Sequence, residues 1–372
     1  MDGSLPATPA QSPIPKVSII VPARNEEANL GDCLQSLTTQ TGVEFEIIVV
    51  DDGSTDRTRE IAGSFAQVRV ISAGPVPNGW TGKNNAMVEG AKKPSGDWLL
   101  FTDADTVHRP GSLARALNEA KNESADLLSY SPEQVVCTFS ERAVMPVIFS
   151  ELAAQYPPHK VRDESSGVVA ANGQYILVRR SAYESVGGHA AVATEILEDV
   201  ALARLFRYAG LRVHFRYGGD AVRTRMYRNW PQLRDGWTKN LALLFPHPAN
   251  LATHIFLQWS IAWFALYVAA SGAASQHFVW ILAFAPWLLV YRRIRAVHFS
   301  TANNLLAISC GLPLFAYLLL GSKRAYENGK VSWKGRDYEV SIPPAKIQST
   351  NAPRILDGQG LGAKSQELGA KS

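Results

Sequence analysis

Cysteine is scarce in this chain of 372 residues, which contains only Cys33, Cys137 and Cys310. Three widely spaced cysteines provide neither a disulfide framework nor the paired spacing of a zinc site. The eight histidines include no His-Glu-x-x-His pair, so that metalloprotease motif is absent as well. The first fifteen residues are rich in proline, serine and alanine and lack an apolar core. We therefore expect a disordered tail rather than a signal peptide, and a reducing, cytoplasmic setting for the N-terminal part.

Charged residues are also few: they make up 19% of the chain, against about 25% in an average soluble protein. Lys, Arg, Asp and Glu are missing altogether from residues 240–291 and again from residues 296–322. The net charge of +4 is too small to indicate nucleic acid binding. Because basic residues gather beside the uncharged stretches, the pattern favours an anionic membrane surface as a partner.

The uncharged part contains three candidate membrane segments, at residues 251–271, 276–291 and 303–322. Lengths near 20 residues suit a bilayer, although the second segment is short. Tryptophan is frequent in this part, as it is at membrane interfaces. We predict two or three transmembrane helices, with a buried helical domain as the alternative.

Two groups of basic residues leave the topology of these segments open. By the positive-inside rule each group marks a cytoplasmic loop. Both cannot be cytoplasmic if the segment between them crosses the membrane fully. Cys310-Gly311 and Pro313 interrupt that segment, which is therefore either a full crossing or a re-entrant or interfacial segment. The two groups are Arg292, Arg293 and Arg295, and Lys323, Arg324, Lys330, Lys334 and Arg336.

The N-terminal two thirds of the chain alternate between apolar runs and segments with helical spacing. The runs are nearly unbroken, which predicts a parallel sheet covered by helices on both faces, in an α/β domain. Asn172-Gly173, between two β-like runs, predicts a hairpin. Polar residues gather where the strands end, and open α/β sheets bind ligands at that edge. The predicted strands are 17–21, 45–50, 68–71 and 98–102, and the predicted helices are 29–39, 55–65, 84–91 and 197–209.

Two familiar phosphate-binding motifs are absent. Thr81-Gly82-Lys83-Asn84 resembles part of a P-loop, but Pro77 stands where that loop needs glycine. Asn84 stands where it needs serine or threonine. No Gly-x-Gly-x-x-Gly follows the first strand, so a dinucleotide-binding fold is not expected either.

Acidic residues instead follow several of the predicted strands. Asp103 and Asp105 flank Ala104 at the end of an apolar run, and alternation along an extended chain lets both carboxylates point the same way. Such a pair suits a hard divalent cation that grips a diphosphate. Each acidic cluster alone is equally explained as a helix cap or a turn. Together on one rim they would repel one another unless a cation or hydrogen-bond donors compensate.

An ordered set of motifs over residues 16–240 resembles the family 2 glycosyltransferases of the GT-A fold. A finer likeness, at residues 79–86, 225–240 and 333–338, is to membrane-bound hopanoid-associated and carotenoid-type members. The resemblance implies a mixed, mostly parallel sheet with helices on both faces, followed here by C-terminal transmembrane helices. The motifs are Val17-Ser-Ile-Ile-Val-Pro-Ala-Arg-Asn-Glu-Glu27, Val49-Val-Asp-Asp-Gly-Ser-Thr-Asp56, Gly79-Trp-Thr-Gly-Lys-Asn-Asn-Ala86, Phe101-Thr-Asp-Ala-Asp105 and Glu198-Asp199.

The resemblance also implies roles by position. Lys83 would lie near the diphosphate, and Asp103 near the ribose or the metal. Asp105 would hold Mg²⁺ or Mn²⁺, which stabilises the charge of the leaving nucleoside diphosphate. The base and ribose pocket would be lined by Pro22, Arg24 and Glu26, with Asp52 on the base.

Asp199 matches the general base of the family. A carboxylate within hydrogen-bond reach assists attack by a hydroxyl group. Its place near a predicted helix start favours a lowered pKa, while neighbouring Glu198 would act in the opposite direction. An acceptor that is already ionised, such as a lipid phosphate, would need the base less.

The predicted protein is therefore a membrane-anchored inverting glycosyltransferase, which moves one sugar from a nucleotide sugar, UDP-linked by preference, to a polyprenol-, hopanoid- or carotenoid-like acceptor. We expect a multi-pass protein of the cell membrane with a cytoplasmic catalytic domain. The alternatives are a processive polysaccharide synthase and an inactive nucleotide-sugar-binding protein. Residues 230–237 contain the residue types but not the spacing of the processive Gln-x-x-Arg-Trp motif. The predicted divisions are a tail at 1–15, the GT-A domain at 16–240, membrane segments at 241–322, a basic juxtamembrane segment at 323–340 and a disordered tail at 341–372.

Overall fold

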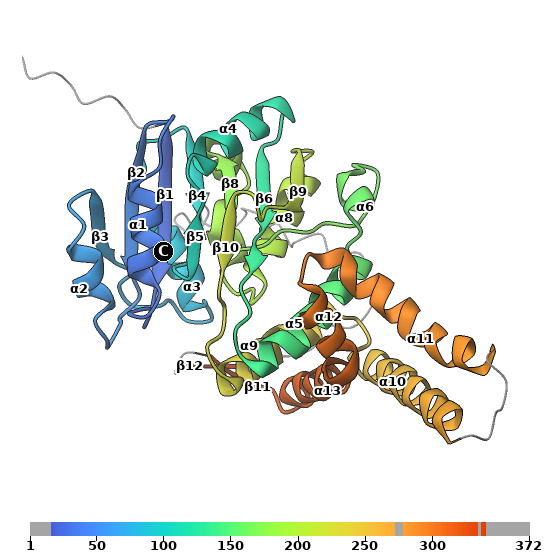
Figure 1. Ribbon diagram of the computed structural model, residues 1–372. Coiled ribbons are helices and arrows are strands. Elements are labelled where there is room, and N and C mark those ends of the chain that lie inside the picture. The colour runs from blue at the N-terminus through green and yellow to red at the C-terminus, as the bar shows by residue number, and fades with distance from the viewer. Residues whose placement is uncertain (1–15, 272–277, 334–335, 340–372) are drawn as a thin grey trace, which may run out of the picture.

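The computed structural model describes residues 16–271, 278–333 and 336–339 (Figure 1). The two predicted disordered tails, 1–15 and 341–372, lie outside the described residues. The described chain has an N-terminal α/β part and a C-terminal helical part (Figure 1).

A seven-stranded sheet in the order β3-β2-β1-β4-β8-β6-β9 forms the centre of the α/β part. β8 runs antiparallel to both of its neighbours, and the other adjacent pairs are parallel. The predicted fold class is thus confirmed as a mixed, mostly parallel α/β sheet. The strands are β1 (Val17–Ala23), β2 (Phe45–Asp51), β3 (Val68–Ser72), β4 (Trp98–Phe101), β6 (Leu127–Ser131), β8 (Ile176–Arg179) and β9 (Val213–Tyr217).

Helices cover both faces of this sheet because its strands are apolar on both sides. On β1, Ile19 packs into the core that contains α1 (Leu30–Thr38) and α4 (Ser112–Asn122). Ile20, on the opposite face, packs into the core that contains α3 (Gly82–Gly90) and α8 (Glu198–Tyr208). The shorter helices of this part are α2 (Thr58–Gly63), α6 (Pro158–Arg162) and α7 (Arg180–Ser185), with a 3-10 turn at Gly188–Val192.

The predicted hairpin around Asn172-Gly173 is wrong. After these residues β8 forms, but no strand of the described chain precedes them directly. Asn172 is held instead by Ser129 of β6: the backbone N–H of Asn172 donates to the Ser129 hydroxyl oxygen at 2.8 Å. The turn therefore packs against β6 of the main sheet, and Asn172 and Gly173 line the cavity described below.

A small second sheet lies beside the main one, in the order β5-β10-β7. It supports the loops that follow β4 and β6. Its strands are β5 (Thr106–His108), β10 (Val222–Thr224) and β7 (Glu133–Gln134).

The C-terminal helices form a separate apolar core around α5. Its members include Ile148 of α5, Leu241 of α9 and Phe315 of α13, all fully buried. The helices are α5 (Phe139–Gln155), α9 (Trp230–Leu244), α10 (Pro248–Ala270), α11 (Phe278–Ile294), α12 (Thr301–Leu306) and α13 (Leu312–Glu327), with a 3-10 turn at Arg295–Val297 and a π-helical stretch at Ala307–Gly311.

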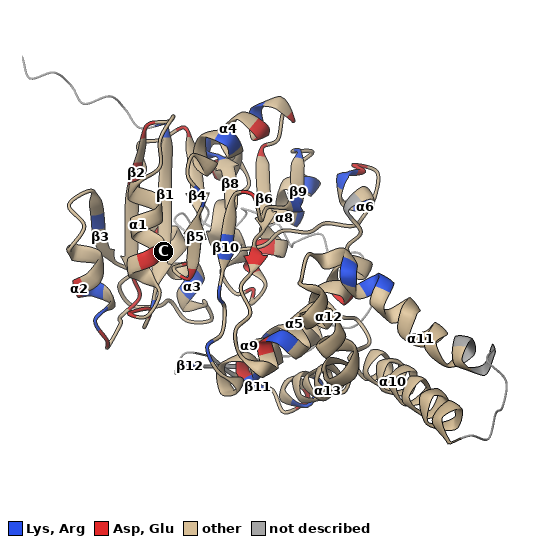
Figure 2. Cartoon of the chain, in the orientation of Figure 1, with Lys and Arg blue, Asp and Glu red and all other residues tan. Residues whose placement is uncertain are grey.

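Two helical stretches of the described chain are long and apolar enough to cross a membrane by length and composition: Pro248–Ala270 and Thr301–Glu327. They match the first and third predicted segments. Only 17% of the most apolar window of α10 is buried, Phe264 is 66% and Tyr267 69% accessible, and Figure 2 shows that the helix carries no charged residue. Half of the most apolar window of Thr301–Glu327 is buried against neighbouring helices. The predicted middle segment corresponds to α11, apart from residues 276–277, which lie outside the described part.

The segment that joins the two basic groups is bound to the protein at both ends, by α5 at one end and by α9 at the other. Arg293, at the end of α11, forms an ion pair with Glu151 of α5. At the other end, the hydroxyl of Tyr326 donates to the backbone oxygen of Lys239 in α9 at 2.7 Å. The Ser322 hydroxyl donates to the oxygen of Thr238 at 2.6 Å. The end of α13 is thus fastened to α9.

Candidate active site

A cavity of about 890 Å³ opens where β1, β2 and β4 end. All eight residues to which the sequence assigned a role line this cavity: Pro22, Arg24, Glu26, Asp52, Lys83, Asp103, Asp105 and Asp199. Their roles remain predictions, but the fold brings the eight side chains to one place from five separate stretches of the chain.

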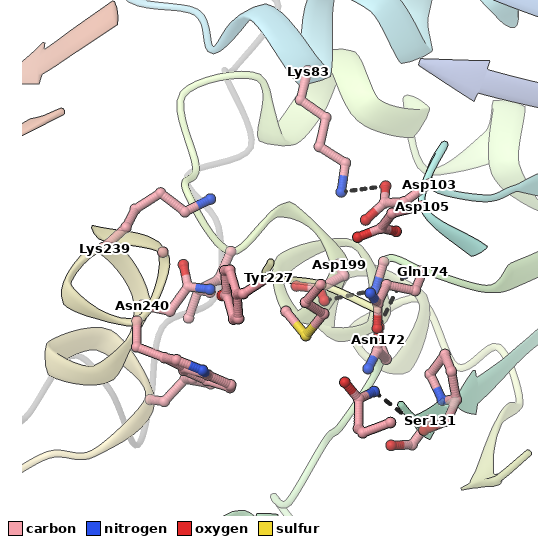
Figure 3. A pocket seen from close by; sticks show the side chains of 18 of the residues that line it. Lys83, Asp103, Asp105, Ser131, Asn172, Gln174, Asp199, Tyr227, Lys239 and Asn240 are labelled. Carbon is pink, nitrogen blue, oxygen red and sulfur yellow. Dashed lines mark hydrogen bonds and ion pairs between the residues drawn. The ribbon is translucent and has the colours of Figure 1, made fainter. Parts of the chain in front are cut away.

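The acidic pair Asp103 and Asp105 lies in the short connection between β4 and β5. Its backbone is held on both sides: the Thr106 hydroxyl donates to the oxygen of Asp103 at 2.7 Å, and the Thr224 hydroxyl donates to the oxygen of Asp105 at 3.1 Å. Figure 3 shows the two carboxylates side by side, facing Lys83. Desolvation in the cavity raises the pKa of Asp103, although Lys83 opposes this.

Lys83, the second residue of α3, binds two carboxylates. Its Nζ lies 2.8 Å from Asp103 Oδ1 and 2.8 Å from Glu198 Oε1. Desolvation alone would lower the pKa of Lys83, but these ion pairs raise it well above its usual value. For Glu198, burial alone would raise the pKa, but Lys83 and Lys239 bring it below its usual value. Lys83 is therefore a fixed cation at the centre of the acidic rim.

Asp199 lies in the first turn of α8 and accepts two backbone hydrogen bonds. The N–H of Gly173 donates to Oδ2 and the N–H of Val200 donates to Oδ1, both at 2.8 Å. The pKa of Asp199 is nevertheless raised to about 6, first by desolvation and then by the negative charge of Glu198. The expectation of a lowered pKa from the helix start is wrong, because loss of solvent outweighs the helix end. The expected effect of Glu198 is confirmed.

Asp52 is held from two directions. Arg24 donates from Nη1 to its backbone oxygen at 2.7 Å. Its carboxylate binds the guanidinium of Arg336 in a two-point contact, with Nη1–Oδ2 at 2.5 Å and Nη2–Oδ1 at 3.1 Å. Sequence reasoning gave Arg336 no role at this site; its only signal was the likeness of residues 333–338 to membrane-bound family members.

Lys239 is a second residue that the sequence analysis did not assign. It projects from α9 into the cavity, as Lys83 does from α3 (Figure 3). Desolvation lowers the pKa of Lys239, and Glu198 opposes this. Lys239 lies in the stretch 225–240 that resembles membrane-bound members, which was the available signal.

Away from the acidic rim, the cavity is lined by apolar side chains of the helical part. Among them are Phe149 and Leu152 of α5, Leu244 of α9, and Phe299. Trp237 also lines this end, is only 3% exposed, and donates from its indole nitrogen to Met145 Sδ at 3.3 Å. One cavity therefore joins a charged end to an apolar end.

The carboxylates of Asp103 and Asp105 fit a Mg²⁺ or Mn²⁺ ion that a substrate helps to bind. The described residues include no group of three or more His, Cys, Asp or Glu side chains that could hold a metal by themselves. A pair of carboxylates is what Mg²⁺ commonly takes from a protein when phosphate oxygens and water supply the other ligands.

Residues 18–187 match the sequence model of the family described as Glycosyl transferase family 2. The 4,4'-diaponeurosporenoate glycosyltransferase of Staphylococcus aureus is 27% identical over 343 residues, which cover 87% of this chain and 88% of that protein. Among solved structures, a mannosyltransferase of Pyrobaculum calidifontis with GDP-Man and Mn²⁺ aligns with a TM-score of 0.48 and 16% identity, covering 84% of this chain and 86% of that one. TarS 1-349 of S. aureus with UDP-GlcNAc aligns with a TM-score of 0.41 and 17% identity, covering 88% and 97%.

Proposed function

We propose that this chain moves a single sugar from a nucleotide sugar to a lipid-like acceptor at a membrane surface, with inversion at the anomeric carbon. The proposal starts from the match of residues 18–187 to the glycosyltransferase family 2 model, by which the chain is a glycosyltransferase. The observation that carries the proposal is the cavity itself, which has a charged end at the sheet and an apolar end between helices.

The charged end is where the donor would bind. Pro22, Arg24, Glu26 and Asp52 would contact the nucleoside, and Lys83 would exchange part of its ion pairing for the diphosphate. Asp103 and Asp105 would hold the divalent cation, which, when bound, supplies positive charge that stabilises the departing nucleoside diphosphate. The N-terminus of α3, which precedes Lys83, also favours an anion.

Asp199 would accept the proton of the attacking hydroxyl. Inversion requires that the acceptor oxygen approach the anomeric carbon opposite the leaving diphosphate. A pKa near 6 leaves Asp199 ionised at neutral pH and makes it a stronger base than an ordinary aspartate. Its two backbone hydrogen bonds would hold the carboxylate in place during the transfer.

The apolar end of the cavity is suited to the acceptor. The aromatic and aliphatic side chains that line it would bind a hydrocarbon body, while a polar head reaches Asp199. The sequence similarity to a carotenoid-type glycosyltransferase supports an acceptor of this class.

The membrane would be contacted by α10 and α11, whose exposed face is apolar. The indole N–H groups of two tryptophans are satisfied within the protein: Trp259 donates to the oxygen of Ser309 at 2.9 Å, and Trp287 donates to the oxygen of Ala262 at 3.0 Å. Internal pairing of this kind suits a surface without water. Since the end of α13 is fastened to α9, we favour an interfacial α13 over a full crossing.

The test is a donor panel. The purified full chain in lipid nanodiscs, with Mn²⁺, is offered UDP-, GDP- and dTDP-sugars together with a bacterial lipid extract, and products are read by mass spectrometry. One lipid species that gains the mass of a single hexose or N-acetylhexosamine is the expected result. A ladder of added sugars would favour the processive alternative. No transfer and no donor hydrolysis with any donor would favour a binding protein.

The pH dependence follows from the raised pKa of Asp199. With a hydroxyl acceptor, kcat/KM is expected to be level above pH 7 and to fall as the pH drops below about 6. The loss should approach about tenfold per pH unit, because only the ionised carboxylate accepts a proton. Initial rates between pH 5 and pH 8 check this, and a profile that is level throughout would contradict it.

A further inference from the structure

The C-terminal hairpin brings a cation to the donor end of the cavity. β11 (Lys330–Trp333) and β12 (Arg336–Glu339) follow α13 directly and pair with each other. Val331 of β11 is 3% exposed and packs in a small core with Ala242 of α9 and Tyr326 of α13. Figure 1 shows β11 beside α9. The hairpin is thus anchored to the helical part, while Arg336 reaches Asp52, 284 positions earlier in the chain.

The contact between Arg336 and Asp52 has the geometry of a strong ion pair. Two guanidinium nitrogens bind the two carboxylate oxygens, which is the arrangement for which arginine is better suited than lysine. The Asp52 side chain is only 5% exposed. A β-carbon added at Gly82 would lie 1.7 Å from Arg336 Nη1 and 2.4 Å from Asp52 Oδ2. The pair therefore lies directly against the first turn of α3, one residue before Lys83.

This location matters because the cavity wall is acidic. Its lining includes seven carboxylates and five cations: Glu26, Asp52, Asp103, Asp105, Glu198, Asp199 and Asp235, against Arg24, Lys83, Arg228, Lys239 and Arg336. A nucleoside diphosphate brings further negative charge. Lys83 already pairs with Asp103 and Glu198, so it does not compensate Asp52. Arg24 donates to the backbone oxygen of Asp52, whereas Arg336 binds its two carboxylate oxygens. Without Arg336, the negative charge of this poorly solvated carboxylate would be less well compensated and would repel the donor.

We propose that Arg336 is a positioning residue of the donor site: its guanidinium holds Asp52 and neutralises it, so that a nucleoside diphosphate can bind beside that carboxylate. The inference rests on the proposed function, and it assigns the C-terminal hairpin to the donor site of that function. Through α13, the hairpin also ties the donor end of the cavity to the apolar helices.

The experiment compares nucleotide binding by full-length variants in detergent. UDP and GDP are titrated with Mn²⁺ by calorimetry, and donor hydrolysis gives kcat and KM. Arg336→Gln is expected to weaken binding of the tighter nucleotide at least about tenfold and to raise the donor KM with little change in kcat. Arg336→Lys should recover part of the affinity, because lysine keeps the positive charge but loses the two-point contact of the guanidinium with the carboxylate. Lys330→Gln, which removes an exposed charge from the same hairpin, is the matched control and should bind as the wild type does.

A double variant separates neutralisation from a merely structural role. Asp52→Asn/Arg336→Gln removes both charges and should bind the nucleotide more tightly than Arg336→Gln alone, and it serves as the test if the single variant does not fold. Equal or tighter binding by Arg336→Gln relative to the wild type would overturn the inference, as would a double variant no better than the single one. A wild-type protein that binds neither nucleotide and hydrolyses no nucleotide sugar would overturn the proposed function, and this inference with it.

Discussion

Replacing Asp199 with asparagine is expected to lower turnover with a hydroxyl acceptor by about 10² to 10⁴, the usual contribution of a general base. Asparagine has nearly the same shape, but its amide does not take a proton at neutral pH. The carboxylate lies on the cavity wall and is held by the N–H groups of Gly173 and Val200, so the loss concerns a side chain already fixed in place. Donor binding should be intact, because the predicted nucleoside contacts lie elsewhere on the wall. Single-turnover transfer to the lipid identified in the donor panel measures the effect.

The matched control for Asp199 is Glu195→Gln, which removes one exposed carboxylate just before the same helix. That variant should transfer sugar at the wild-type rate. Near-normal turnover by Asp199→Asn with a hydroxyl acceptor would remove Asp199 from the mechanism. If the acceptor in the panel is a lipid phosphate, the nucleophile is already ionised, and a much smaller loss is expected.

Loss of the divalent cation is the second change with a large expected effect. Chelation by EDTA, or Asp105→Ala, should abolish both transfer and the slow hydrolysis of the nucleotide sugar. The reason is that the described residues contribute two neighbouring carboxylates at this point, so removal of one leaves too few protein ligands for a hard cation. The charge on the departing diphosphate would then lack its main counter-charge apart from Lys83. Release of UDP or GDP from the donor chosen by the panel is the measurement.

Addition of Mn²⁺ distinguishes the two ways of losing the cation. The chelated wild-type protein should regain full activity, whereas Asp105→Ala should not. Asp97→Ala is the matched control, since it removes an exposed carboxylate at the opposite end of the same strand. Undiminished hydrolysis in EDTA would show that Lys83 and its neighbours suffice, and the assignment of Asp103 and Asp105 to a cation would fall.

Local pattern was enough to predict the α/β layers and the position of the site. Strands such as β1 and β2 are short apolar runs that end in polar residues, and parallel strands that end at one edge place those residues together. For this reason the six predicted site residues at or after the ends of β1, β2 and β4 line one cavity, which Lys83 of α3 and Asp199 of α8 join from the first turns of their helices. The same reasoning failed at Asn172-Gly173, where a turn signal was taken for a hairpin. A turn pair reports local backbone preference, whereas Ser129 of a distant strand decides where that turn is held.

The sequence by itself thus determined the elements, the edge of the sheet that carries the site and the residue types available there, because these depend on spacing within a few residues. Only the tertiary structure decided which charges meet. It placed Arg336 on Asp52 across 284 positions and Lys83 between Asp103 and Glu198. It also placed Asp199 beside Glu198 on the wall of the cavity, where partial loss of solvent raises its pKa although the helix start alone predicted a fall. Ion pairing depends on the distance between charges in space, and desolvation depends on the solvent that packing removes. Neither the distance nor the loss of solvent can be read from the residues next to one another in the sequence.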